Sequence, residues 1–277
     1  MKKIIFSLAL LTIYSVFALD ITEKIELDLK VTPKTLIRTD YTIVSKFGEY
    51  FRTPSVKFAY KYDSSGKIIE SSELNARDVL VNKIVDAYNS DGFLIGETCF
   101  DVENSKIWNT EIIYKDGKKV ESAGYSKAGI LKGKTLYSYT NDNLTDESYY
   151  DEEGAIVWKI VRSYNSKGMI ESESEYSADG MLSEERRYEY NPNNTLDSIS
   201  YNNEKGILTS KDVCRYDNNA SLYEITTYNA DNKTIKRTLV KYDAQGNIAK
   251  VTVYNVARKF GTTVNEMAEM SEFAYEY

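Results

Sequence analysis

The chain has 277 residues, carries 42 acidic against 35 basic side chains, and contains no histidine. Its net charge of −7 opposes nonspecific binding to phosphate backbones, so nucleic acid is not an expected partner. Without histidine, serine and cysteine nucleophiles lack their usual general base and zinc lacks its commonest nitrogen ligand, so the sequence predicts no enzyme and no catalytic, cofactor or metal site.

Residues 1–18 have the pattern of a secretory signal peptide. Lys2 and Lys3 precede an apolar run, and Val16 and Ala18 suit the −3 and −1 positions of signal peptidase. The apolar run is short for a membrane span, and no later stretch approaches about 20 apolar residues, so no transmembrane helix is expected. We therefore expect an exported protein, in the periplasm or at the cell surface.

Residues 19–61 fit the repeat that follows only in part, and we expect them to form capping strands. The stretch from Ile21 to Val31 alternates like a strand. Tyr50 lies twelve residues before Tyr62 and has Val56 six residues after it, which is a partial copy of the motif.

Residues 62–254 form an array of sixteen short turn motifs. The clearest copy is Tyr242-Asp243-Ala244-Gln245-Gly246-Asn247-Ile248, in which an aromatic residue is followed by glycine or asparagine at +4 and a branched aliphatic at +6. The aromatic position, called the slot below, recurs at alternating intervals of 11–12 and 14–15 residues. The slots are Tyr62, Leu74, Tyr88, Phe100, Tyr114, Tyr125, Tyr139, Tyr150, Tyr164, Tyr176, Tyr190, Tyr201, Tyr216, Tyr228, Tyr242 and Tyr254.

The +4 position is predicted to be the left-handed residue of a hairpin turn, because glycine and asparagine accept positive φ most easily. Gly117 and Gly206 are displaced from +4 by one residue. Ala220 and Asp78 replace glycine or asparagine at +4 and are expected to mark looser turns.

Each repeat is expected to be one strand and one turn. From Ile170 to Tyr176, serines share one face with the two ends while Glu171, Glu173 and Glu175 share the other, which is strand periodicity. The fold class predicted is all-β, an antiparallel meander of about sixteen short strands forming a long, coiled single sheet. The alternating intervals suggest that turns on one edge of the sheet differ in length from turns on the other.

The two cysteines are not expected to form an intramolecular disulfide. Cys99 lies one residue before a slot and Cys214 two residues before another, so strand alternation places them on opposite faces. They also lie nine strands apart, about 43 Å at about 4.8 Å per strand if the sheet is open, whereas bridged Cα atoms lie within about 7 Å.

Residues 255–277 depart from the repeat and are expected to form a C-terminal cap. Thr263 and Glu266 have capping-box spacing ahead of Met267 and Met270, which suggests a short helix. The last residues, 273–277, alternate like a strand.

The copies that begin at Tyr62, Tyr150 and Tyr242 resemble the YD repeats of Rhs and teneurin-like surface proteins, and MORN-like repeats are a weaker relative. The resemblance covers most of residues 62–254. It implies an all-β spiral or extended sheet at the cell surface, with a binding role toward carbohydrate or protein. This chain is too short to enclose a toxin domain, so only the architecture and a general surface role carry over.

Three sets of residues were weighed as chemical sites and interpreted as structural. Gly133-Lys134-Thr135 resembles the tail of a phosphate-binding loop but lacks its first glycine and a following helix, which indicates the start of a hairpin strand. Turn carboxylates that calcium could use are interpreted as caps of their own turns, at Asp63, Asp91, Asp151, Asp179, Asp231 and Asp243. A glycosidase-like carboxylate set is interpreted as a solvated strand face, at Glu171, Glu173, Glu175, Glu184 and Glu185.

The slot tyrosines and the two tryptophans, Trp108 and Trp158, are interpreted as strand packing. The leading hypothesis is a non-enzymatic, exported β-repeat scaffold that binds an unidentified protein or carbohydrate at the cell envelope. One alternative is an outer-membrane β-barrel, which the charge on both faces of the stretch from Leu182 to Tyr188 opposes. A polysaccharide-acting enzyme is a further alternative.

Overall fold

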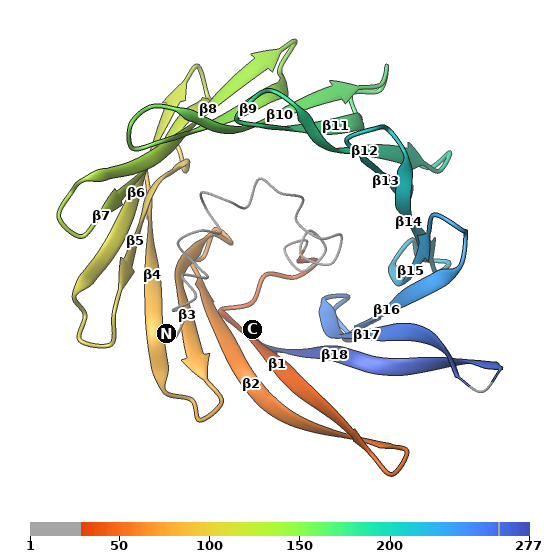
Figure 1. Cartoon of the computed structure of the whole chain (residues 1–277). Coiled ribbons are helices and arrows are strands. Elements are labelled where there is room, and N and C mark those ends of the chain that lie inside the picture. Colours follow the sequence, from red (N-terminus) through yellow and green to blue (C-terminus); the bar gives the residue numbers. More distant parts are fainter. Residues whose placement is uncertain (1–28, 260) are drawn as a thin grey trace.

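The computed structural model describes residues 29–259 and 261–277, which form a ring of eighteen antiparallel strands (Figure 1). The predicted signal peptide, residues 1–18, lies outside the described residues, as do residues 19–28. The strands are β1 (Thr35–Lys46), β2 (Glu49–Tyr62), β3 (Ile68–Asn75), β4 (Leu80–Tyr88), β5 (Leu94–Phe100), β6 (Lys106–Lys115), β7 (Lys118–Ser126), β8 (Leu131–Thr140), β9 (Asn143–Asp151), β10 (Ile156–Tyr164), β11 (Ile170–Ser177), β12 (Leu182–Tyr190), β13 (Leu196–Asn203), β14 (Leu208–Tyr216), β15 (Leu222–Asn229), β16 (Thr234–Tyr242), β17 (Ile248–Lys259) and β18 (Thr262–Glu276). No helix in this part of the chain has the length and apolarity to cross a bilayer.

The sheet closes on itself because β1 pairs with β2 on one side and with β18 on the other. Leu36 is opposite Tyr60 of β2 and Tyr275 of β18. Every other strand pairs with its two neighbours in sequence. The antiparallel meander is confirmed, but the open, coiled sheet expected from the sequence is wrong, and the sheet is a closed barrel. Closure removes the two unpaired edges that an open sheet of this width would expose.

The segments expected to cap the array supply strands of the ring itself. Within 19–61 lie β1 and β2, and residues 255–277 complete β17 and form β18. The helix suggested by Thr263 and Glu266 is wrong, because β18 is a strand from Thr262 to Glu276, and the strand expected at 273–277 is its last part. Pairing with both β17 and β1 satisfies the backbone of this segment and outweighs its local capping signal.

The turns lie on two rims. Rim A is the edge formed by turns after even-numbered strands, and rim B is the edge formed by turns after odd-numbered strands. In the turn after β16, the Asp243 amide donates to the Asn247 carbonyl at 2.8 Å and the Gly246 amide donates to the Asp243 carbonyl at 3.2 Å. The same five-residue pattern recurs on both rims.

The +4 residue is left-handed, as predicted. Gly246 has a φ of 86° and Asn232 a φ of 59°. Ala220 and Asp78 have φ values of 61° and 63° and keep the hydrogen bonds of the turn, so the prediction of looser turns there is wrong. In the first of these turns the Asp217 side chain accepts two backbone amides, at 2.8 and 2.9 Å, and this cap holds the loop in shape whatever residue occupies +4.

The alternating intervals come from strand stagger rather than from unequal turns. Asp86, Glu97 and Thr110 form one row across β4, β5 and β6. In this row Asp86 lies two residues before the slot Tyr88, whereas Thr110 lies four residues before the slot Tyr114. The turns of rim A are therefore displaced along the strand direction by two residues for every two strands. The same advance recurs from β14 to β16 and from β16 to β18. Such a stagger is what tilts strands in a closed barrel.

One slot was assigned one residue too early. Asn202 is opposite Leu208 at a bulge, as Tyr176 is opposite Leu182, so Asn202 occupies the slot instead of Tyr201. Gly206 then lies at +4 and has a φ of 71°.

Candidate functional site

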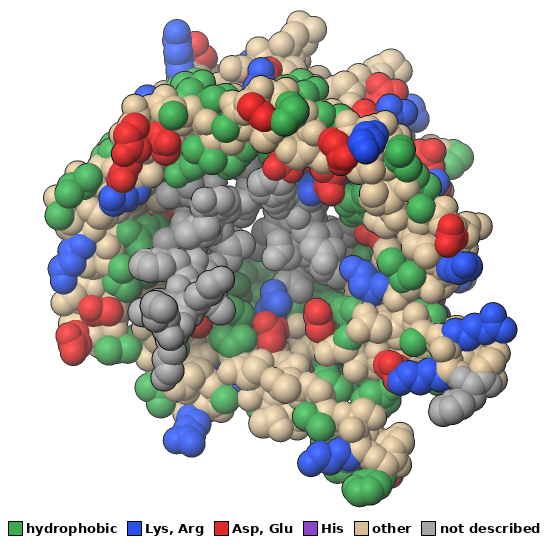
Figure 2. All heavy atoms as spheres, viewed as in Figure 1, with side chains coloured by type: hydrophobic (Ala, Val, Ile, Leu, Met, Phe, Trp, Pro, Cys, Tyr) green, Lys and Arg blue, Asp and Glu red, His purple; other side chains and the backbone are tan. Residues whose placement is uncertain are grey.

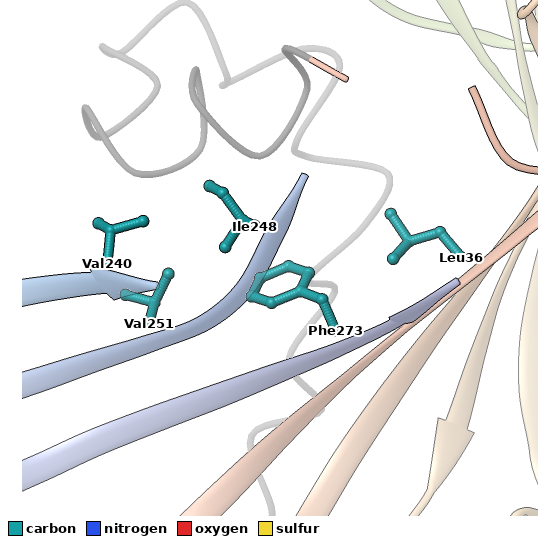
Figure 3. Packing of buried hydrophobic residues seen from close by; sticks show 5 residues of the cluster. All are labelled: Leu36, Val240, Ile248, Val251 and Phe273. Carbon is teal, nitrogen blue, oxygen red and sulfur yellow. The ribbon is translucent and has the colours of Figure 1, made fainter. Parts of the chain in front are cut away.

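The wall of the barrel has two faces of different chemistry. Figure 3 shows Leu36, Val240, Ile248, Val251 and Phe273 pointing into the ring from β1, β16, β17 and β18. All five side chains are buried. Successive side chains of a strand point to opposite faces. These five residues therefore show which side chains of their strands lie on the inner face, and the pairing register extends the assignment to the neighbouring strands.

The outer face carries ion pairs around the circumference. Lys250 and Glu272 adjoin the inward-pointing Val251 and Phe273, so both lie outside, where they pair at 3.4 Å. The same assignment places further ion pairs outside, namely Lys61–Glu70, Lys134–Glu121, Lys159–Asp146, Lys211–Glu189 and Arg237–Glu224. Figure 2, which looks into the ring from one end, shows basic and acidic side chains along its outline.

The inner face carries clusters of buried apolar side chains along one long sector, interrupted by the Arg38–Asp40 ion pair of β1 and by the buried Asp212 of β14. The cluster shown in Figure 3 extends across β16, β17, β18 and β1, and it includes Tyr60 and Tyr62 of β2. A second cluster continues it onto β13, β14 and β15 with Ile199, Cys214 and Ile225. A third lies on β9 and β10, where Trp158 stacks on Tyr149 with ring centroids 5.7 Å apart. Side chains converge on a concave face, so these residues bury one another without a second sheet.

A belt of tyrosine hydroxyls lines the inside of rim A. The Tyr216 hydroxyl donates to the carbonyl oxygen of Leu196 at 2.8 Å, which links the end of β14 to the start of β13. Equivalent bonds join Tyr88 to Ile68, Tyr139 to Lys119, Tyr164 to Leu144, Tyr190 to Ile170, Tyr242 to Leu222 and Tyr275 to Ile248. Each bond ties one turn of rim A to the turn before it. These slot tyrosines are edge packing, as the sequence indicated.

A network of buried charges crosses the inner face of β9 to β12. Arg162 bonds to Glu147 at 2.5 Å and to Glu173 at 2.7 Å, and only 9% of its side chain is exposed. Arg186 bonds to Glu173 at 3.2 Å and to Glu184 at 2.8 Å. Burial raises the pKa of Glu147, although the neighbouring guanidinium of Arg162 opposes this shift.

The carboxylates weighed as a glycosidase set are therefore divided by the wall. Glu173, Glu175 and Glu184 line a small pocket on the inner face with Ile160 and Arg186, whereas Glu185 lies on the outer face. The interpretation as a solvated face is wrong for Glu173, which is 7% exposed, because the concave side of the sheet carries it between two arginines.

Two further acidic side chains lie opposite each other on β4 and β5. Asp86 and Glu97 are direct cross-strand neighbours, and the Thr110 hydroxyl donates to Glu97 at 3.1 Å. Burial raises the pKa of Glu97 to about 7 and that of Asp86 to about 6. Burial also lowers the pKa of Lys119, whose ammonium lies 4.5 Å from the centre of the Tyr137 ring.

Both cysteines are reduced and buried. Their predicted placement on opposite faces is wrong, since Cys99 is opposite Ile84 and Cys214 is opposite Ile225, and all four side chains belong to the inner face. Slots on rim A point inward and slots on rim B point outward. Cys99 was counted from a rim B slot and Cys214 from a rim A slot, so an odd and an even separation place them on the same face.

Four of the six turn carboxylates cap their own loops, including Asp179, whereas Asn89 and Asn229 are the caps in the turns of Asp91 and Asp231. Asp63 accepts the backbone amides of Ser65 and Lys67 at 2.8 and 2.9 Å, and Asp151 and Asp243 make the same pair of bonds. No group of three or more Cys, Asp or Glu side chains within 29–259 and 261–277 is arranged to hold a metal ion.

Gly133-Lys134-Thr135 lies in β8, two residues after the strand begins, as expected. A Cβ atom at Gly133 would meet the Tyr149 hydroxyl at 2.2 Å, so this glycine serves close packing against β9. Trp158 packs in the inner wall as predicted, and Trp108 is opposite Cys99.

No protein-family model matches the chain, and no curated protein is significantly similar to it. Among solved structures, a porin-like protein from Bacteroides uniformis ATCC 8492 is similar in fold, with a TM-score of 0.50 and 11% identity over 89% of this chain and 98% of that one. A porin-like protein from Bacteroides vulgatus ATCC 8482 has a TM-score of 0.40 and 13% identity over 89% of this chain and 99% of that one. The TcdB2–TccC3–Cdc42 complex has a TM-score of 0.30 and 13% identity over 77% of this chain and 16% of the matched one. The first likeness shows a porin-like barrel fold, and the resemblance to YD-repeat proteins stays a prediction.

The inner wall was not identified as a site from the sequence. The signal was present in two places. One is the stagger recorded in the intervals. The other is the residue two before a rim A slot, which is charged at Asp86 and Arg162 but apolar or aromatic at Tyr60, Ile112, Tyr137, Tyr188, Cys214 and Val240. Neither signal shows which face of the sheet is concave, because the curvature depends on closure of the sheet by pairing of β1 with β18.

Proposed function

We propose that this protein is a non-enzymatic barrel of the aqueous cell envelope that holds an apolar or amphiphilic ligand, such as an acyl chain, against its inner wall. The observation that carries the proposal is that ion pairs such as Lys250–Glu272 lie on the outer face, while the inner face bears buried apolar side chains such as Val251 and Phe273 beside ion pairs of its own. A lipid-embedded barrel has the opposite arrangement, an apolar outer band and a polar interior.

The size of the ring supports a binding role. Barrels of 16–18 strands are too wide for wall side chains to meet at the axis, so they enclose a lumen. The sector from β13 to β1 would contact the apolar part of a ligand, and the charged sector from β9 to β12 would lie toward its polar part. Ligand pockets are typically apolar with a few convergent polar groups.

An outer-membrane pore is the second candidate, because the fold is porin-like. It would require lipid to contact Lys159, Lys211 and Lys250, although a charge at the bilayer midplane destabilises a barrel by about 2–4 kcal/mol. Most of the strands also have fewer than the 9–11 residues expected for a membrane-spanning strand, or only just reach that length.

Cell fractionation separates the two candidates. We expect the mature chain to be released without detergent, either with the periplasmic contents on osmotic shock or by a carbonate wash that removes peripheral proteins. Retention through a carbonate wash, together with a heat-modifiable band on gels, would instead establish the membrane pore.

Ligand binding is tested directly with a fluorescent fatty acid. Val240→Lys places a charge on the inner wall, and Leu239→Lys places the same charge next to it on the outer face. We expect Val240→Lys to weaken probe binding at least tenfold and Leu239→Lys to change it less than twofold. Circular dichroism of both variants checks that the sheet is retained, and equal affinity of the two folded variants would refute the inner-wall site.

A further inference from the structure

Apolar side chains stand exposed on the turns of rim B. Val79, Val102, Ile130, Met181 and Ile207 belong to five different turns of this rim, and each is more than half exposed, from 55% to 65%. Exposed apolar residues repeated along one edge indicate an interaction surface more than a packing accident.

Four of these five residues, all except Val102, lie directly before the +6 position of their turn, where two other rim B turns have Ser105 and Lys233. Rim A is more polar at this position. The residue before the +6 aliphatic is polar in four of its turns, at Lys67, Thr195, Ser221 and Asn247. It is apolar at Phe93 and Met169, and Phe93 stacks on Tyr114 with ring centroids 4.8 Å apart.

The β1–β2 hairpin forms the most prominent part of rim B. Phe47 at its tip is fully exposed, and the cross-strand pair Val44 and Phe51 is 43% and 52% exposed. Figure 1 shows this hairpin and the β17–β18 hairpin extending outward from the ring with their tips apart, and Figure 2 shows apolar side chains at the tip of the former, the lowest point of the view.

Phe47 is unfavourable for folding in two respects. Its φ of 56° lies in the left-handed region, where asparagine or glycine is usual in a two-residue hairpin turn. Its ring is also fully exposed, so folding gains nothing from its burial. A residue that is strained and fully exposed serves the fold poorly, which points to a partner outside the chain.

The charges beside the hairpin are balanced by charges of the opposite sign, and Lys46 and Glu49 are cross-strand partners at its tip. Arg52 bonds to Glu272, and Lys259 bonds to Glu266. The hairpin therefore presents aromatic rings without a free basic patch, and a chain of net charge −7 is repelled by anionic surfaces. An electrically neutral, apolar partner fits this surface best.

We propose that rim B, led by Phe47 and Phe51, is a membrane-contact surface that inserts into the headgroup and upper acyl region of a zwitterionic bilayer. Exposed aromatic side chains on one edge of a protein anchor at this interface. Contact between the B rims of two copies is less favourable, because it would oppose the acidic turns that contain Glu103, Glu152 and Glu153. The rim B residues are not part of the inner wall, so the membrane-contact proposal does not depend on ligand binding there.

The test is flotation of the mature protein with phosphatidylcholine vesicles. The double variant Phe47→Asn, Phe51→Thr keeps residues that suit a left-handed turn and a strand, and Phe93→Ser on rim A is the matched control. We expect the wild type and the control to float with the vesicles within twofold of each other, and the double variant to bind at least fivefold less. Addition of phosphatidylglycerol or 0.5 M salt should not increase binding.

A second variant reports membrane contact by a gained fluorescence signal rather than by a loss of binding. In Phe47→Trp, the added emission should shift to the blue when phosphatidylcholine vesicles are present, as expected for a ring that leaves water. Absence of flotation by the wild type, or equal flotation of the double variant, would overturn the proposal. A dimer in light scattering that Phe47→Asn abolishes would also overturn it and would identify a second copy as the occupant.

Discussion

The side-chain amide of Asn247 pairs with the backbone of Val31 on both of its edges. Its Nδ2 donates to the Val31 carbonyl at 2.7 Å, and its Oδ1 accepts the Val31 amide at 3.3 Å. Asn247 also accepts the Lys30 amide at 2.7 Å and donates to the Tyr277 hydroxyl, and it is 1% exposed. One turn residue thus fastens the segment before β1 and the last residue of the sequence to rim A.

Asn247→Ala should lower the free energy of unfolding by about 2–3 kcal/mol, because it removes three part-buried hydrogen bonds to the backbone of Lys30 and Val31, each worth about 1 kcal/mol. Urea denaturation measures the change. Ser221→Ala, at the same position of the preceding rim A turn, should change stability by less than about 0.5 kcal/mol. Equal effects of the two substitutions would show that the Asn247 bonds do not hold the segment.

Tyr164→Phe removes one bond of the tyrosine belt, the 2.7 Å contact with the Leu144 carbonyl. We expect a loss of about 1 kcal/mol in unfolding free energy. Combination with Tyr216→Phe, which lies in a different hairpin, should give an additive loss. Tyr150→Phe on the outer face of rim B is the control and should be nearly neutral; a loss there as large as that of Tyr164→Phe would contradict a specific role for the belt.

Arg162→Met should destabilise the barrel by about 3–5 kcal/mol, because Glu147 and Glu173 would stay buried without their shared cation. Lys250→Met, which breaks an exposed pair on the outer face, should lose at most about 1 kcal/mol. Thermal unfolding of both variants measures the contrast. If both melt alike, the inner network does not depend on burial.

Glu97 should make the barrel less stable as the pH rises. Burial raises its folded pKa to about 7, against about 4.3 in an unfolded chain, so the folded state binds the extra proton between these values. The protein therefore has no penalty from this group below about pH 4 and loses stability as the pH rises toward about 7.

Glu97→Gln removes the titration, so the variant should exceed the wild type in melting temperature by a few degrees at pH 8 and match it near pH 4. Other titrating groups are the same in both proteins, so their effects on the melting temperature cancel in the difference between variant and wild type. Glu111→Gln, exposed on the outer face of β6, is the matched control for the loss of one carboxylate. A gap between Glu97→Gln and the wild type that stays constant with pH would contradict the shifted pKa.

The local structure was largely predictable from the sequence because each repeat encodes its own turn. Gly246 and Asn232 indicated the left-handed positions, and Asp243 indicated a side-chain cap, since these effects depend on neighbouring residues alone. The error at Tyr201 has a local cause as well, because a tyrosine on the inner face lies next to the true slot at Asn202.

Closure and the assignment of faces were not predictable in the same way. Whether Leu36 meets Tyr275 depends on contacts across the whole chain, and no local motif near Thr263 signals that β18 will be a strand. The two faces also looked alike in the sequence, since Glu173 lies inside and Glu185 outside. Only curvature decides that Glu173 is buried between two arginines while Glu185 pairs with a solvent-exposed arginine, Arg187, on the outer face.

The pairing of β1 with β18 also determines the order in which the barrel can assemble. Thr35 and Glu276 are partners across almost the entire sequence, whereas every other strand pair is a local hairpin. Hairpins can therefore form and associate as the chain emerges, but β1 keeps one unpaired edge until the last strand arrives. A chain that leaves a ribosome or a translocase from its N-terminus would carry this open edge through nearly the whole process, and contacts of such long range form slowly. The final step is thus the one at which misassembly with a second chain competes most directly with folding.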